Sequence, residues 1–245
     1  MKAQYDASGF VVGQVRFVAS RVRALRQQID SLSLGVAVPE QPTIDVRDGF
    51  VFQIFDVPRR PPPLGELPRD PLLTRVAQEL VGSRVVVAWA LVLNKVRSPT
   101  ANWAVPWHQD TSVYCTHIPP DASGELRAGF ATFRPTDHSV ANLTVARVAL
   151  DRDTTTSGCL RVLPGSHKWG RVSGGEGGRL GGHAGTAIEL EPGDVAFFNP
   201  LLMHRADENR TSSQRRVVHI YYRPVGMPLQ GTGWIDWYGV AAPSH

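Results

Sequence analysis

The hydrophobic pattern divides the chain into a helical N-terminal part and a β-rich remainder. Apolar residues recur at spacings of three and four over residues 12–33, which predicts an amphipathic helix. A second helix is predicted to begin at Asp70-Pro71, because Asp suits an N-cap and Pro suits the first turn, and to end at Gly82. Residues 58–71 form a proline-rich connector between the two helices.

From residue 85 onward, short apolar runs alternate with turn residues, a pattern typical of β proteins. Strands are predicted at about residues 85–96, 103–118, 141–151, 158–163, 186–191, 194–203 and 215–223. Helical material followed by short strands favours a mainly β fold with flanking helices, either a β-sandwich or a jelly roll. We find no internal repeat and no second domain boundary, so residues 1–245 are expected to form a single domain.

Composition argues against several classes of protein. No apolar run reaches the length of about eighteen residues that a membrane span needs, and the N-terminus lacks a signal-peptide hydrophobic region. Cys115 and Cys159 are too few for a disulfide framework, so a reducing cytoplasm is expected. The net charge is +4, but the arginines are scattered and form no nucleic-acid-binding motif. A small-molecule partner is expected, and a mildly basic surface would favour an anionic one. The oligomeric state stays open.

His108 and Asp110 form the most informative short pattern. They lie two residues apart in a segment expected to be a strand, so their side chains should share one face. His204, at the end of a later apolar strand, would complete a set of two imidazoles and one carboxylate, which is the ligand set of non-haem Fe(II) oxygenases. The alternative is ordinary: a half-exposed strand with a polar face, and a buried or rim histidine.

Arg215 begins another predicted strand, eleven residues after His204. Its planar guanidinium suits two-pronged binding of a carboxylate, although an edge charge in solvent is the simpler interpretation. On a regular strand Arg216 points to the opposite face, so only one of the two arginines can face the interior. Together with the three metal-ligand candidates, Arg215 indicates iron and a 2-oxo acid cosubstrate.

Longer motifs around these residues resemble the phytanoyl-CoA dioxygenase family of Fe(II)/2-oxoglutarate oxygenases. The resemblance rests on YDASGFVV at 5–12, PWHQD at 106–110, SGCLRVLPGSHKWG at 157–170 and PGDVAFFNPLLMH at 192–204. It implies a double-stranded β-helix, the cupin-like jelly roll. It also implies His108, Asp110 and His204 as catalytic iron ligands, and Arg215 as the partner of the distal carboxylate of 2-oxoglutarate.

The resemblance places two further basic residues near the cosubstrate. Lys95 falls where many members have a cosubstrate-facing basic residue, and Arg147 falls where many have Trp beside the active site. The alternative for Arg147 is a paired structural arginine on an inner strand. His167 is expected to be a turn or supporting residue. Four histidines have no partner at metal-ligand spacing and are assigned no role: His117, His138, His183 and His219.

The activity that the resemblance implies is oxidation of a small molecule. Fe(II), 2-oxoglutarate and O2 would release succinate and CO2 while the substrate is hydroxylated, cyclised or desaturated. Asp110 stands where related halogenases have a small residue, which argues against halogenation. An Arg- and Ala-rich composition suggests a high-GC bacterium, in which such enzymes often tailor antibiotics. A polar natural product is therefore favoured over a coenzyme A thioester.

Two other functions remain open at this point. One is a Zn(II)-dependent hydrolase or isomerase on the same scaffold, which would not need Arg215. The other is a non-catalytic binding protein that keeps the barrel. The glycine-rich segment 165–185 cannot hold a regular element, and it is interpreted either as a surface insertion or as a lid over the active site.

Overall fold

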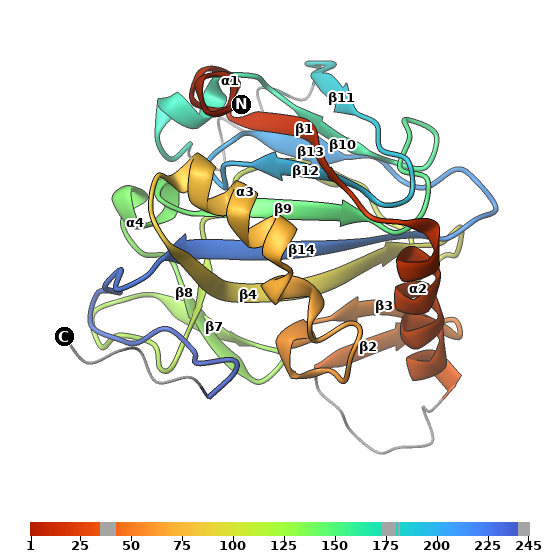
Figure 1. Ribbon diagram of the computed structural model, residues 1–245, viewed down its shortest axis with the longest axis horizontal. Coiled ribbons are helices and arrows are strands. Elements are labelled where there is room, and N and C mark those ends of the chain that lie inside the picture. Colours follow the sequence, from red (N-terminus) through yellow and green to blue (C-terminus); the bar gives the residue numbers. More distant parts are fainter. Residues whose placement is uncertain (35–42, 173–179, 181, 240–245) are drawn as a thin grey trace.

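Antiparallel strands form three sheets in the computed structural model, which describes residues 1–34, 43–172, 180 and 182–239 (Figure 1). The largest sheet contains, in spatial order, β1 (Phe10–Arg16), β12 (Asp194–Phe198), β9 (Thr144–Ala149), β14 (Arg215–Pro224), β4 (Val85–Lys95), β3 (Phe50–Ile54) and β2 (Ile44–Arg47). The second contains β11 (Thr186–Ile188), β10 (Leu160–Val162), β13 (His204–Ala206) and β5 (Val105–His108). The third contains β6 (Val113–Cys115), β8 (Phe130–Phe133) and β7 (Gly124–Arg127).

The inner faces of the sheets share one buried hydrophobic cluster. It includes Val145 and Phe198 of the large sheet, Leu160 and Val162 of the second sheet, and Phe133 of the third. This arrangement is the expected mainly β jelly roll with flanking helices, and the fold prediction is confirmed.

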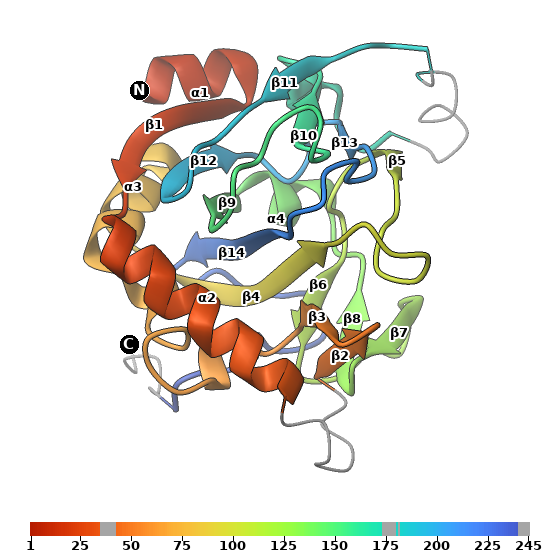
Figure 2. The same cartoon turned by 90° about the vertical axis from the view of Figure 1, so that its right-hand side faces the viewer.

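Helices lie outside the sheets. They are α1 (Lys2–Ser8), α2 (Ala19–Leu34), α3 (Pro71–Val81) and α4 (Asp137–Ala141), with 3-10 turns η1 (Val57–Arg59), η2 (Leu67–Arg69) and η3 (Ser166–Trp169). Helix α3 crosses β4, β14 and β9 on the outer face of the large sheet, and α2 lies along the same face (Figures 1 and 2). None of the helices among the described residues is long and apolar enough to span a membrane.

Helix α3 begins and ends where its sequence predicts. The Asp70 carboxylate accepts a hydrogen bond from the Leu72 amide at 2.8 Å, which caps the first turn. Gly82 ends the helix in the left-handed conformation, with φ of 82°. Leu73 and Val76 point toward the large sheet and are buried, and each contributes about 1.5–3 kcal/mol by burial.

Strand β14 contributes side chains to both faces of the large sheet. Val218, Ile220 and Tyr222 belong to the hydrophobic cluster under the helices. The alternate residues, His219 and Tyr221 among them, point inward. One strand therefore anchors the helices with every second residue and leaves the others for the site.

The predicted helix over residues 12–33 is wrong in its first part. Residues 10–16 form β1, which pairs with β12, and the helix begins only at Ala19. The apolar spacing was misleading because Val12 and Val18 do not contribute to a buried helical face: they are 37% and 67% exposed. Gly13, at φ of 83°, also breaks helical geometry.

Several predicted strands differ from the structure. The strand over 103–118 is two strands, β5 and β6, and the one over 194–203 ends at Phe198. The hairpins β2–β3 and β7–β8 were not predicted. Each turns through two residues of positive φ, at 48–49 and 128–129, as two-residue hairpin loops of type I′ require.

Candidate active site

A cavity of about 610 Å³ is lined by residues from all three sheets. The inner face of the large sheet contributes residues of β3, β4, β9 and β14. The second sheet contributes His108 and His204, and the third contributes Tyr114 and Thr132. A volume of this size lies within the range of roughly 300–1,000 Å³ that pockets for small molecules occupy.

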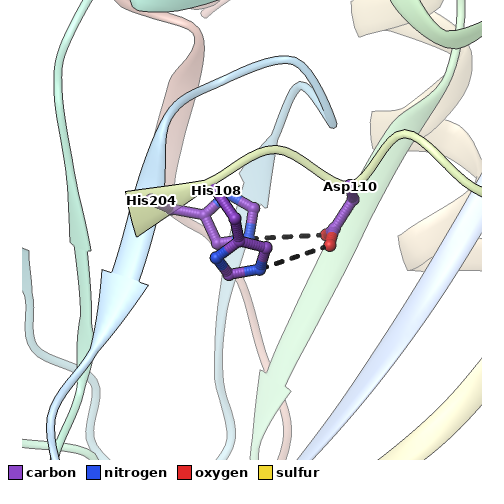
Figure 3. Close-up of side chains that lie close together, drawn as sticks. All are labelled: His108, Asp110 and His204. Atoms are coloured by element: carbon purple, nitrogen blue, oxygen red, sulfur yellow. Dashed lines mark ion pairs between the residues drawn. The ribbon is translucent and has the colours of Figure 1, made fainter. Parts of the chain in front are cut away.

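The structure brings His108, Asp110 and His204 together in this cavity. His204, the first residue of β13, pairs directly with His108, the last residue of β5. The Nε2 atoms of both histidines lie 3.6 Å from carboxylate oxygens of Asp110, as the dashed lines in Figure 3 mark. One donor atom from each residue lies within 4.8 Å of the others, close enough to hold a single metal ion.

Strand alternation does not explain the position of Asp110, which is a correction to the sequence argument. Strand β5 ends at His108, and residues 109–112 are irregular. The Asp110 amide donates to the Pro200 carbonyl at 2.9 Å, and the Gln109 side chain donates to the Leu201 carbonyl at 2.7 Å. The loop before His204 therefore fixes the carboxylate beside the two imidazoles.

Hydrogen bonds orient all three side chains. Nδ1 of His108 lies 2.8 Å from the Pro106 carbonyl, and Nδ1 of His204 lies 2.7 Å from the Leu202 carbonyl. Because a carbonyl only accepts, each Nδ1 carries the proton and each Nε2 keeps a lone pair that faces Asp110. The Tyr221 hydroxyl donates to Oδ2 of Asp110 at 2.8 Å. Two oriented imidazoles and an oriented carboxylate fit a divalent first-row metal.

The charge states of His204 and Asp110 agree with ligand chemistry. Burial alone would lower the pKa of His108, but the adjacent Asp110 outweighs burial and raises it. Burial lowers the pKa of His204 to about 4, so its ring is neutral at pH 7. Burial alone would raise the pKa of Asp110, but the nearby His204 and His108 outweigh it and hold that pKa well below its ordinary value. A neutral imidazole and an ionised carboxylate are the forms that bind metal.

Three basic residues, Lys95, Arg147 and Arg215, form a group in the cavity lining that we call the cation floor. Asp153, which is fully buried, lies between the two arginines. It accepts from Nε and a terminal nitrogen of Arg147 at 3.1 and 2.7 Å, and its other oxygen lies 3.0 Å from Nε of Arg215. Arg215 also donates to the Gly158 carbonyl.

Lys95 lies opposite Arg215 in the β4–β14 pairing and donates to the Asp207 carbonyl at 2.6 Å. Burial, followed by the charges of Arg215 and Arg147, lowers its pKa to about 6. Burial also lowers the pKa of Arg215, to about 10, which leaves it charged at pH 7. Two guanidinium groups therefore face the single carboxylate of Asp153, and the excess positive charge suits a bound anion.

Arg216 points away from the cavity, as strand alternation predicts. Its guanidinium binds Asp151 at 2.7 and 3.0 Å and Asp30 of α2 at 2.6 Å. It is only 6% exposed, so it is a buried structural residue and not a surface charge.

Sequence reasoning missed three residues of the site. His219, to which it gave no role, is buried in the cavity lining, and a ring nitrogen lies 2.6 Å from Arg147. Burial and then Arg147 hold its pKa well below 6.5, so it is a neutral acceptor. Tyr221 and Asp153 were also missed. Alternation along 215–221 contains the signal for His219 and Tyr221, because both share a face with Arg215.

The remaining expected features lie elsewhere. His117, His138, His167 and His183 are not part of the cavity lining, and His167 lies in η3. The glycine-rich segment 165–185 was predicted to hold no regular element, but residues 166–169 form η3. The lid interpretation stays a prediction, because residues 173–179 and 181 of this segment lie outside the described residues.

Comparison with known proteins gives a family match over most of the chain. The model described as "Phytanoyl-CoA dioxygenase (PhyH)" matches residues 5–217. A "Probable phytanoyl-CoA dioxygenase" of Caenorhabditis elegans is 28% identical over 182 residues, covering 66% of this chain and 51% of that protein. The peroxisomal phytanoyl-CoA dioxygenase of Homo sapiens is 31% identical over 104 residues, covering 37% and 30%. The matched part of the chain thus spans about half of the length of the first relative and less than a third of the length of the second.

Solved structures share the fold at low identity. EctD from S. alaskensis with bound Fe has a TM-score of 0.70 and 24% identity, covering 93% of this chain and 77% of that one. The non-heme alpha ketoglutarate dependent carbocyclase SnoK from nogalamycin biosynthesis has a TM-score of 0.65 and 19% identity, covering 91% and 82%.

Proposed function

This chain belongs to the phytanoyl-CoA dioxygenase family, and we propose that it is a non-haem Fe(II)- and 2-oxoglutarate-dependent oxygenase acting on a small molecule. The observation that carries the proposal is the convergence of His108, Asp110 and His204, with donor atoms within 4.8 Å of one another. A family match alone would not carry it, because related folds host many activities.

In this proposal His108, Asp110 and His204 hold Fe(II). Bound there, Fe(II) supplies the redox chemistry that couples dioxygen to decarboxylation of the 2-oxo acid. The protein contributes orientation. The backbone carbonyls at Nδ1 fix both rings, and the hydrogen bond from Tyr221 fixes one oxygen of Asp110. Such supporting contacts are worth about 10–100-fold in metal affinity.

The cation floor binds 2-oxoglutarate in the same proposal. Arg215 takes the distal carboxylate, because a guanidinium can donate two parallel hydrogen bonds to it. Arg147 and Asp153 keep Arg215 in place, and Lys95 adds a further donor beside it. A Zn(II)-dependent hydrolase or isomerase would have no use for this buried positive charge, so the cation floor favours the oxygenase over that alternative.

The overall reaction follows from these parts. 2-Oxoglutarate, O2 and a substrate C–H bond give succinate, CO2 and a C–OH group, so one oxygen atom enters each organic product. Loss of two hydrogens, as in ring closure or desaturation, releases the second oxygen atom as water. Asp110 fills the position that a halide would need, which supports oxygenation over halogenation. Trp89, Leu91 and Tyr114 line the cavity and would contact the substrate body.

Other features of the chain agree with a bacterial tailoring enzyme for natural products. SnoK, whose structure this chain resembles, comes from nogalamycin biosynthesis. Cys115 and Cys159 are buried and unpaired, which supports a reducing cytoplasm as the location. Strand β14 pairs with β4 and β9 in the sheet that β1 also joins, which supports a single domain over 1–245.

The test is to add Fe(II) and 2-oxoglutarate without oxygen and record the visible absorption band of a 2-oxo acid chelated to Fe(II). Oxygen is then admitted, and the slow release of succinate is measured even without a substrate. His204→Ala should lose both signals, whereas the control His117→Ala, outside the cavity, should keep them. Zn(II)-supported hydrolysis, or oxidation that continues undiminished without any 2-oxo acid, would contradict the proposal.

A further inference from the structure

We propose that the substrate carries an anionic group, a carboxylate or another small oxyanion, that binds Arg134 on the wall formed by β6, β7 and β8. This inference rests on the proposed function, because it assigns the substrate part of the same cavity. Arg134 is separate from the cation floor, which lies on β4, β9 and β14 and is assigned to 2-oxoglutarate.

The charges that line the cavity are strongly unequal. Among the described residues of the lining, Asp110 is the one acidic residue, against five arginines: Arg127, Arg134, Arg147, Arg205 and Arg215. Beyond the cation floor, Arg127 is paired with Glu125 at 3.1 Å and Arg205 with Asp207 at 3.0 Å. Arg134 has no hydrogen bond or ion pair with any residue that the structure describes, although it lines the cavity.

Strand pairing places Arg134 at the end of the three-stranded sheet that lies next to the segment with Asp110. Val113 of β6 pairs with Phe133 of β8, so Ser112 and Arg134 are the next residues at the same end of this sheet. Ser112 follows Asp110 by two residues, and both line the cavity together with Thr111. The hydroxyls of Ser112 and Thr111 have no side-chain hydrogen bonds to other described residues, so they add donors beside the arginine.

The neighbouring wall suits an apolar or planar substrate body. Trp89 stacks on Tyr221 with ring centroids 4.0 Å apart and an angle of 16° between planes, and Tyr114 lies 5.7 Å from Trp89. Phe55 and Leu91 line the same cavity. A ligand with an aromatic body and one anionic end would contact both parts, whereas a neutral ligand of the same shape would contact only the apolar part.

The test uses two fluorescent probes that differ in that anionic end alone. They are 1-anilinonaphthalene-8-sulfonate and N-phenyl-1-naphthylamine, which lacks the sulfonate. Both are titrated into the protein loaded with Fe(II) and 2-oxoglutarate without oxygen. Arg134→Gln should weaken binding of the sulfonate about tenfold, the effect of one charge-assisted hydrogen bond, and leave the neutral probe unchanged. Arg134→Lys should restore most of the sulfonate binding.

Arg75→Gln, on the exposed side of α3, is the matched control and should change neither probe. The inference is overturned if Arg134→Gln leaves sulfonate binding unchanged, or if it weakens both probes equally. The absorption band of bound 2-oxoglutarate is recorded in the same samples. If the unmodified protein forms no such band, the proposed oxygenase function fails. The ratio of the dissociation constants of the two probes still tests the anion site by itself.

Discussion

Replacing Arg215 and Arg216 by lysine, one at a time, separates the two faces of β14. Both residues are buried, both are ion-paired, and they are adjacent in sequence. They differ in direction, because Arg215 lines the cavity and Arg216 binds Asp151 and Asp30 on the helix side. Lysine keeps the positive charge at each position and removes the planar fork.

The expected effects differ in kind. For Arg215→Lys, one charge-assisted hydrogen bond to 2-oxoglutarate is lost, worth about 1.5–3 kcal/mol, so its KM should rise about tenfold to a hundredfold. For Arg216→Lys, the bonds of 2.7 and 3.0 Å to Asp151 and of 2.6 Å to Asp30 cannot all be kept. The free energy of unfolding should fall by about 1–3 kcal/mol, with the KM unchanged.

Succinate formation at varied 2-oxoglutarate concentration gives the first quantity, and urea unfolding of the ligand-free protein gives the second. The prediction is that Arg215→Lys mainly raises the KM for 2-oxoglutarate, whereas Arg216→Lys mainly lowers the free energy of unfolding. An equal rise in KM for both variants would show that the assignment of the two faces, and with it the cosubstrate site, is wrong.

Three further outcomes are expected. The pKa of Lys95 falls from 10.5 to about 6 on folding, so the unfolded chain binds this proton more tightly than the folded chain does. The free energy of unfolding should therefore rise between about pH 6 and pH 10.5, by up to about 1.4 kcal/mol per pH unit. In Lys95→Met, the free energy of unfolding should depend less on pH over this range. Tyr221→Phe should weaken Fe(II) binding about tenfold in a metal titration, because it removes the 2.8 Å hydrogen bond to Asp110, and unchanged affinity would exclude the positioning role. Turnover by the unmodified protein should be independent of chloride under labelled O2, and Asp110→Ala should abolish it; a chlorinated product from the unmodified protein would refute the assignment.

The sequence predicted those elements whose structure is determined by neighbouring residues in the chain. Helix α3 has its cap and its terminal glycine, and both act as expected. His108, Asp110 and His204 were found because two imidazoles and one carboxylate form a recognisable metal-ligand set, and because the longer motifs around them resemble one family. Strand period predicted that only one of Arg215 and Arg216 faces the interior, and the family resemblance indicated Arg215.

Other parts depend on contacts that a single sequence does not reveal. The apolar spacing before Ala19 fitted a helix, but pairing with β12 made residues 10–16 a strand. Asp110 reaches the histidines through backbone contacts to a distant loop. Asp153 stands in a run of polar residues and gives no signal until the fold buries it between two arginines.

In the part of the chain that the structure describes, no strand of the three-stranded sheet pairs with a strand of the other two sheets. Tyr114 of this sheet and Arg134, which follows β8 directly, form part of the cavity wall, while the histidines and the cation floor lie on the other two sheets. Insertions or exchanges at the tip of the β7–β8 hairpin would therefore change this wall without breaking the strand pairing of the other two sheets, provided that Phe133 keeps its place in the shared core. Such a division would let substrate preference change while the catalytic framework is kept, and it makes this hairpin the segment to exchange between relatives in the laboratory.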